Sequence, residues 1–189
     1  MEEIRKIADS PIWNQGKSDG IYGYPLPLDK DFMEIGKRLA EIFPVNQTYI
    51  IGPFCCAKSD DSHLGPFKWA HDFMVPDGTN IIAAESGKIV QAIDSFTKWG
   101  DSEKYRDQLN YITIQHLNGE YSQYCHVALD SFHDTGLKVG DIVKKGMVIG
   151  KVGKNGWTDR DHLHFIVFKT GKIEGNPYNF YSLEVRFEK

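Results

Sequence analysis

The sequence predicts a mainly β domain, an antiparallel β-sandwich or barrel, with a short N-terminal helical extension. Helical spacing of apolar residues ends at Pro44 and does not return later in the chain. After that point, short β-branched and aromatic segments alternate with glycine, proline and asparagine turns. The 18 glycines and nine tyrosines suit such a turn-rich protein. Many short strands at regular spacing are typical of antiparallel sandwiches and barrels.

The extension is expected to contain one amphipathic helix. Residues 1–27 are polar and turn-rich, and we expect them to be irregular. From Asp29, apolar side chains recur at helical spacing, with Asp29 or Asp31 as the candidate N-cap and Pro44 as a stop signal. We therefore divide the chain into an extension, residues 1–47, and a main domain, residues 48–189.

The main domain is expected to consist of short strands joined by tight turns. Pro76-Asp77-Gly78 is a turn signature, and Asn118-Gly119 between two alternating segments is a strong hairpin signal. Residues 94–108 are polar and predict a loop. The pattern predicts strands over residues 48–51, 73–75, 81–85, 88–93, 111–116, 120–126, 139–146, 148–153 and 165–168.

Composition excludes several classes of function. A net charge of −4 and a pI near 6.0 give no electrostatic case for binding nucleic acid or an anionic membrane. The three cysteines, Cys55, Cys56 and Cys125, form no Cys-x-x-Cys pair, so no cysteine zinc site is indicated. Either one bridge joins Cys125 to the adjacent pair, or the thiols are reduced and buried.

The sequence leaves localisation and oligomeric state open. The first six residues are mixed in charge and lack an apolar core, so no secretory signal is visible. No run approaches the roughly 18 apolar residues that a transmembrane helix needs. We therefore expect no transmembrane segment.

The segment His162-Leu163-His164 leads into the apolar run Phe165–Phe168. Because alternate residues of a strand share a face, His162 and His164 are expected on one side and Leu163 on the other. Alone, the pair is as compatible with surface histidines as with a metal site. Catalytic zinc takes three protein ligands and leaves a fourth position for water. The candidate ligands are His63, His71, Asp72, His126, His162 and His164.

Two other residues, His116 and Cys125, are expected to take no part in catalysis or metal binding. His116 ends an alternating strand and is expected to be structural or exposed rather than part of a site. Cys125 adjoins His126, and adjacent strand residues face opposite ways. We therefore expect Cys125 to point into the core and not to act as a nucleophile.

Four blocks of the sequence resemble lysostaphin-type (LytM-like) zinc endopeptidases, in that family's order. They are Ala70–Val90, with its Asp-Phe-x-x-Pro-x-Gly-Thr pattern; Asn110–His116, followed by Tyr124-Cys125-His126; the glycine-rich hairpin Val139–Gly150; and His162-Leu163-His164-Phe165. The resemblance implies a β-sandwich of the duplicated hybrid kind and one Zn²⁺ per chain. It also implies a zinc metalloendopeptidase that hydrolyses peptide bonds in peptidoglycan cross-links or interpeptide bridges.

The resemblance also implies residue roles. Asp72 and His164 match zinc ligands, and His126 and His162 match the two catalytic histidines that do not bind the metal. The first ligand departs from the family, because the position four residues before Asp72 is Lys68. We choose His63, nine residues before Asp72, as the third ligand.

Alternatives remain at this point. His71 is a rival third ligand, although in a strand it would face away from the adjacent Asp72. A chain with too few ligands would resemble the family's inactive members, so a wall-binding or regulatory module of the same fold is the second hypothesis. A biotinyl or lipoyl carrier is disfavoured, because no lysine occupies the expected hairpin tip.

Overall fold

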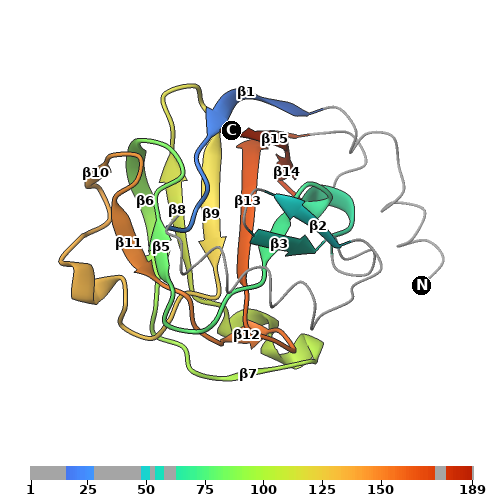
Figure 1. Cartoon of the computed structure of the whole chain (residues 1–189), viewed down its shortest axis with the longest axis vertical. Coiled ribbons are helices and arrows are strands. Elements are labelled where there is room, and N and C mark those ends of the chain that lie inside the picture. The colour runs from blue at the N-terminus through green and yellow to red at the C-terminus, as the bar shows by residue number, and fades with distance from the viewer. Residues whose placement is uncertain (1–15, 28–47, 52–53, 58–62, 173–177, 189) are drawn as a thin grey trace.

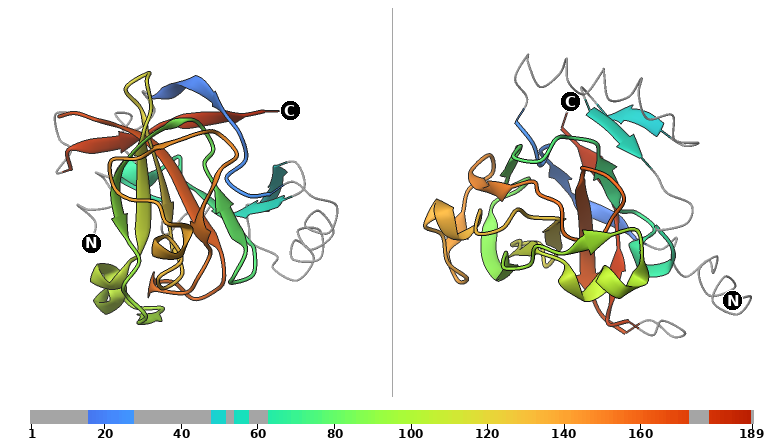
Figure 2. Two further views of the ribbon diagram at one scale, coloured as in Figure 1. Left: turned by 90° about the vertical axis from the view of Figure 1, so that its left-hand side faces the viewer. Right: turned by 90° about the horizontal axis from the view of Figure 1, so that it is seen from below.

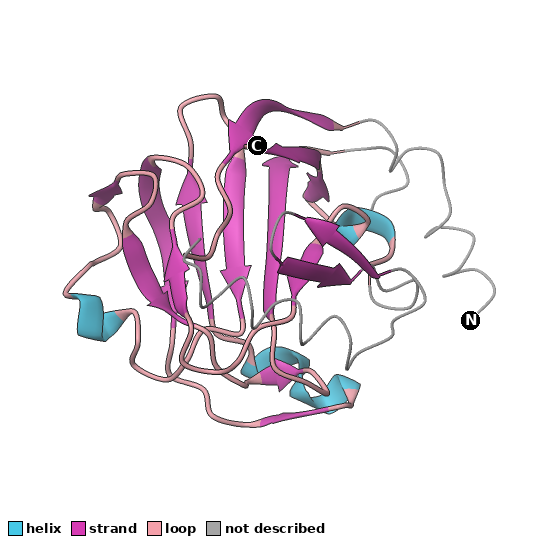
Figure 3. Cartoon of the chain, viewed as in Figure 1, coloured by secondary structure: helices cyan, strands magenta, loops and turns pink. Residues whose placement is uncertain are grey.

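The computed structural model describes residues 16–27, 48–51, 54–57, 63–172 and 178–188, and strands dominate them (Figures 1 and 3). The expected helix between Asp29 and Pro44 lies outside the described residues. The helices within them are short 3-10 turns: η2 (Gly65–Phe67), η3 (Glu103–Gln108) and η4 (His133–Thr135). No helix among the described residues is long and apolar enough to span a membrane.

A nine-stranded antiparallel sheet forms the centre of the protein. Its order is β10-β6-β8-β9-β13-β4-β3-β2, and β14 also pairs with β13. The strands are β10 (Ile142–Val143), β6 (Gly87–Ile93), β8 (Tyr111–Gln115), β9 (Tyr121–Cys125), β13 (Leu163–Thr170), β4 (His71–Phe73), β3 (Phe54–Ala57), β2 (Thr48–Ile51) and β14 (Phe180–Ser182).

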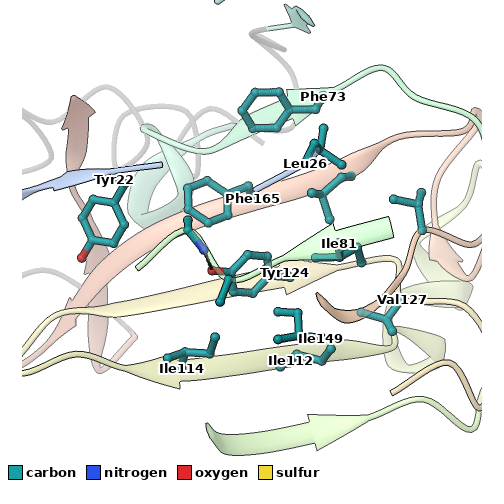
Figure 4. Packing of buried hydrophobic residues seen from close by; sticks show 14 of the residues in the cluster. Tyr22, Leu26, Phe73, Ile81, Ile112, Ile114, Tyr124, Val127, Ile149 and Phe165 are labelled. Atoms are coloured by element: carbon teal, nitrogen blue, oxygen red, sulfur yellow. Dashed lines mark hydrogen bonds between the residues drawn. The ribbon is translucent and has the colours of Figure 1, made fainter. Parts of the chain in front are cut away.

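A second layer covers one face of this sheet. It includes the antiparallel pair β5 (Asn80–Ile82) and β11 (Val148–Lys151). Figure 4 shows Ile81 and Ile149 of this pair packed against Ile112 and Tyr124 of the central sheet. All four side chains are fully buried. The predicted β-sandwich class is thereby confirmed, because the core lies between two layers of strands.

Part of the N-terminal extension belongs to the sheet structure. β1 (Lys17–Tyr22) pairs in parallel with β15 (Glu184–Phe187), and the two run across one end of the main sheet (Figure 2). The expectation of irregular chain is therefore wrong for residues 17–22. The inward side chains of this strand include polar Ser18, which bonds to a buried glutamate, so no apolar alternation marked it.

Most predicted strands of the main domain are confirmed, with shifted ends. The strand expected at residues 73–75 lies at His71–Phe73. The Asn118-Gly119 turn joins β8 to β9, and Gly119 has the positive φ, 77°, that such turns require. The loop expected at residues 94–108 contains η3 and a short strand, β7 (Trp99–Gly100), which pairs with β12 (Gly156–Trp157).

The two faces of β13 have different surroundings. Leu163, Phe165 and Val167 are fully buried and belong to the core cluster. His164, Ile166 and Phe168 alternate with them and point to the opposite side. We call this second side of the central sheet the site face. It carries the side chains of Asp72 and Cys125, which pair directly with His164 across β4 and β9.

Candidate metal centre

Strand pairing brings two predicted metal ligands together. Asp72 and His164 lie opposite each other in β4 and β13, so their side chains project from the same face. The Nδ1 atom of His164 is 2.8 Å from Oδ1 of Asp72. The register of two neighbouring strands therefore produces a carboxylate–imidazole pair.

His63 completes a cluster of three candidate ligands. It lies just before η2, and its Nε2 atom is 3.1 Å from Oδ2 of Asp72. Ligand atoms of His63, Asp72 and His164 all lie within 4.8 Å of one another. The His63 ring is buried, and apart from this contact with Asp72, which lacks hydrogen-bond geometry, neither of its nitrogens has a partner among the described residues. A buried imidazole without such partners is unusual and suits a metal ligand.

His71, the rival ligand, faces the other way. Its neighbour Asp72 points to the site face, so strand alternation directs the His71 ring to the core side. There the ring meets Phe187 edge-on at 5.3 Å between centroids, and Phe73 at 6.2 Å. The structure therefore does not bring His71 to the cluster.

Two further imidazoles border the three candidate ligands. The His162 Nε2 atom is 3.7 Å from Oδ1 of Asp72, and the His162 and His126 rings are 4.5 Å apart. The Nδ1 atom of His162 lies 3.0 Å from the carbonyl oxygen of Arg160, and that of His126 lies 2.7 Å from the carbonyl oxygen of Asn155. A carbonyl can only accept, so we assign the neutral tautomer's proton to Nδ1 in both rings, which leaves Nε2 free.

His126 occupies an unusual backbone conformation. Its φ of 62° is left-handed, a region that residues other than glycine seldom adopt and that recurs at functional sites. Because this left-handed residue directly follows β9, the alternation of side chains between the two faces does not continue from Cys125 to His126. The prediction that Cys125 points into the core is therefore wrong. It lies on the site face beside His164, and its thiol donates to Oε1 of Gln123 at 3.6 Å.

Cys125 is a free and buried thiol. Burial, with a contribution from the Asp72 carboxylate, raises its pKa. A protonated, enclosed thiol is a poor nucleophile. The prediction that Cys125 is not a nucleophile therefore agrees with its surroundings, although its predicted orientation does not.

Burial and neighbouring side chains shift the pKa values of Asp72 and His126. Burial alone would raise the pKa of Asp72, but the imidazoles of His162 and His63 and the hydrogen bond from His164 hold it well below its usual range. Burial lowers the pKa of His126, and the neighbouring His162 and His164 lower it further. Asp72 is therefore ionised and His126 neutral near pH 7, as metal binding and proton acceptance require.

Two buried asparagines hold the backbone around His126. The side chain of Asn155 accepts from the backbone N–H of Asn110 at 2.7 Å and donates to the carbonyl of Val127, also at 2.7 Å. The side chain of Asn110 bonds the same Val127 carbonyl and both backbone polar groups of Phe96. Asn110 lies within one of the four sequence blocks described above, whereas Asn155 lies in none of them, and no local pattern marks either residue as a support for His126.

His116 lies outside the cluster. It is buried, with Nδ1 2.9 Å from the carbonyl oxygen of Ser86 and Nε2 2.9 Å from Oγ of Ser122. These partners explain its burial, and the prediction of a structural role is consistent with them.

Comparison with known proteins places the chain in a family. A sequence profile described as peptidase family M23 matches residues 67–179. The chain belongs to this family. M23 members are zinc metallopeptidases that include peptidoglycan endopeptidases. His63 lies just before the matched segment, in agreement with its unusual spacing from Asp72.

Curated relatives support the family assignment. The chain is 33% identical, over 179 residues, to a protein of Buchnera aphidicola named as an uncharacterized metalloprotease, with coverage of 89% of this chain and 42% of that one. It is 32% identical over 117 residues to glycyl-glycine endopeptidase ALE-1 of Staphylococcus capitis, covering 62% of this chain and 27% of that protein. For lysostaphin of Staphylococcus simulans, the identity is also 32%, over 62% of this chain and 20% of that one. This M23 chain thus spans less than half the length of these relatives.

The donor set fits zinc. Two imidazoles and one carboxylate are a common protein ligand set for catalytic zinc, and they leave a position for water or substrate. His63 contributes ring nitrogens that make no hydrogen bond within the described residues, and Asp72 contributes an ionised carboxylate. Both can therefore serve as metal ligands. His63, Asp72 and His164 are thus able to hold a metal on the site face.

Proposed function

We propose that this M23 chain is a zinc-dependent metalloendopeptidase that hydrolyses peptide bonds in peptidoglycan cross-links or interpeptide bridges. The observation that carries the proposal is a His-Asp-His cluster, with His63 and Asp72 buried and His164 half-buried, bordered by two more imidazoles with free Nε2 atoms. The names of two relatives, a glycyl-glycine endopeptidase and a peptidoglycan DD-endopeptidase, support this substrate class.

In this proposal, His63, Asp72 and His164 hold one zinc ion. When bound, the ion lowers the pKa of a coordinated water to about 7 and polarises the scissile carbonyl. Asp72 also orients His164 through the 2.8 Å contact between them. Burial of His63 and Asp72, with His164 half-buried, limits competition from bulk water for the ligand atoms.

His126 and His162 carry the proton transfers. Each holds a proton on Nδ1 through a backbone carbonyl, so each presents Nε2 as an acceptor. One takes the proton of the attacking water on its Nε2 atom and then delivers that proton to the leaving amine, while the Nε2 atom of the other accepts a hydrogen bond from the water. Their ring separation of 4.5 Å allows both to reach one substrate.

The alternative is a wall-binding or regulatory module that keeps the fold without turnover. The joint presence of all five side chains favours the enzyme, because binding alone needs neither a metal cluster nor two free imidazoles. The two functions differ in what the zinc-loaded protein does to its ligand.

The test is digestion of purified peptidoglycan by the zinc-loaded chain, with product analysis by mass spectrometry. We expect about one zinc per chain and new amine and carboxyl termini at a defined peptide bond. His126→Ala and His162→Ala should lower turnover by about 10²–10⁴-fold while retaining zinc. A chain that takes up no zinc contradicts the proposal. Binding to peptidoglycan without cleavage by the zinc-loaded protein would favour the regulatory module.

A further inference from the structure

A row of hydrogen-bonded polar side chains runs along the site face beside the candidate metal centre. Gln123 of β9 pairs with Ile166, which lies two residues beyond His164 in β13. On its other side Gln123 pairs with Thr113, and Thr113 pairs with Gln91. Directly paired residues share a face, so this row lies next to the row that contains Asp72 and His164.

The side chains of this row are joined to one another. The Gln123 amide donates to Oγ1 of Thr113 at 2.9 Å, and the Thr113 hydroxyl donates to Oε1 of Gln91 at 3.4 Å. The amide NH₂ group of Gln91 is left without a partner among the described residues. These hydrogen bonds therefore hold the side chains of Gln123 and Thr113 in place. Gln91, at the other end of the row, keeps an NH₂ group that can donate to a ligand.

A pocket of about 290 Å³ opens over this row. Ile166, Phe168 and Phe180 supply its apolar surface, and Gln91, Gln123 and Asn179 supply amide groups. Phe168 stacks on Tyr121 and meets Phe180 edge-on, with centroid separations of 5.3 and 5.5 Å, so its wall is fixed in place.

None of the described residues that line this pocket carries a charge. A charged group entering it would lose hydration without meeting an opposite charge, which is unfavourable. An uncharged group with amide functions would keep its hydrogen bonds through the glutamine and asparagine side chains. An apolar wall with a few convergent polar groups is typical of ligand pockets.

We propose that this pocket is a substrate subsite that takes an uncharged, amide-bearing part of the peptide two to four residues from the cleaved bond. The proposal rests on the peptidase function proposed above. At about 3.3 Å per residue, Ile166 lies roughly 7 Å along β13 from His164. An extended peptide that leaves the metal centre along β13 reaches the pocket with its second residue. The subsite therefore selects against carboxylates at these positions.

The test compares two forms of one probe, soluble cross-linked peptidoglycan fragments with free or amidated side-chain carboxyl groups. We expect the zinc-loaded wild-type chain to show a KM at least about fivefold lower for the amidated form, with similar kcat, because the free carboxylate is desolvated without a partner. Gln91→Lys supplies a partner at the exposed rim and should reverse this preference. Gln115→Lys is the matched control, since Gln115 lies on the same face one row further on, outside the pocket.

Equal KM values for the two forms, or equal effects of the two lysine variants, would overturn the subsite. If the wild-type chain cleaves neither form, the peptidase proposal fails, and calorimetric binding of the same fragments then decides the subsite. The subsite is supported if the wild-type chain binds the amidated form more tightly, the Gln91→Lys variant loses this preference and the Gln115→Lys variant keeps it. Absence of binding, or binding without preference, contradicts it.

Discussion

The Nδ1 atom of His126 lies 2.7 Å from the carbonyl oxygen of Asn155, and this contact fixes both the ring and its tautomer. The same hydrogen bond, from the ring to a backbone carbonyl, helps to hold a residue whose φ of 62° is intrinsically unfavourable. Asn155 is itself held through its side chain by Asn110 and Val127. The position of one catalytic candidate thus depends on a buried asparagine that does not reach the metal centre.

Asn155→Ala is expected to lower kcat by about tenfold or more, because a loosened carbonyl no longer holds the His126 ring in its reactive orientation. KM and zinc content should stay close to wild type, since neither the ligands nor the pocket changes. The unfolding free energy should fall by about 1–3 kcal/mol, as the N–H of Asn110 loses a buried acceptor. Steady-state kinetics with zinc analysis measure this, and an unchanged kcat would remove the positioning role.

His63→Ala and His71→Ala form a matched pair that tests the third ligand. His63→Ala should weaken zinc binding by more than the roughly 10–100-fold typical of residues outside the ligand set. His71→Ala should leave zinc affinity unchanged and lower the unfolding free energy by about 1–3 kcal/mol, because its ring packs against Phe73 and Phe187. Competition with a chromophoric chelator and urea unfolding measure the two effects. The reverse pattern would make His71 the ligand.

Sequence reasoning placed most of the candidate site because strand alternation is a local rule. It put Asp72 and His71 on opposite faces before their strand was located, and the structure agrees. The distance from His63 to Asp72 could not be derived in this way, because His63 lies in a loop whose path depends on the whole fold. Only its chemistry and the absence of a histidine at residue 68 pointed to it.

The failures share a physical cause. Cys125 was misplaced because the left-handed backbone at His126 interrupts alternation, and no local pattern marks that reversal. The strand at residues 17–22 was missed because a distant glutamate, rather than an apolar neighbour, satisfies its inward side chain Ser18. Both features depend on contacts between segments far apart in the sequence.

Removal of zinc is expected to destabilise the fold as well as to abolish turnover. A ligand present at 1,000 times its dissociation constant stabilises the native state by about 4 kcal/mol. The thermal unfolding midpoint should therefore fall when zinc is chelated and recover when it is restored. His164→Ala should show a much smaller difference between the two conditions. Equal midpoints for the wild-type chain with and without zinc would argue against a site formed by His63, Asp72 and His164.

Glu120→Gln is expected to destabilise the protein by about 1–3 kcal/mol and to release β1. The fully buried Glu120 carboxylate accepts from Oγ of Ser18 at 2.7 Å, from the backbone N–H of Asp19 at 2.8 Å and from the hydroxyl of Tyr22 at 2.8 Å. An amide would turn one acceptor into a donor facing these donors. Urea unfolding and amide exchange of residues 17–22 measure the effect.

The control for that change is Glu184→Gln on the neighbouring strand. The Glu184 carboxylate lies 4.0 Å from the exposed ammonium of Lys17, and exposed pairs contribute little. We expect its unfolding free energy to stay within about 0.5 kcal/mol of wild type. A similar fall in unfolding free energy in both variants would show that Glu120 does not hold β1 in place.

His116 should make stability depend on pH between neutrality and mild acid. Burial lowers its pKa below the usual histidine value of about 6.5, and the hydrogen bond to the Ser86 carbonyl partly offsets this effect. Below about pH 6.5 the unfolded chain therefore binds a proton that the folded chain does not, and stability falls as pH falls, by at most about 1.4 kcal/mol per pH unit for this group. The loss ends below the lowered pKa, where both states are protonated. Urea unfolding of the zinc-loaded chain at pH 7.5 and 5.5 measures the fall in unfolding free energy between the two pH values. This fall should be smaller for His116→Gln than for wild type, and equal falls would show that His116 is not responsible.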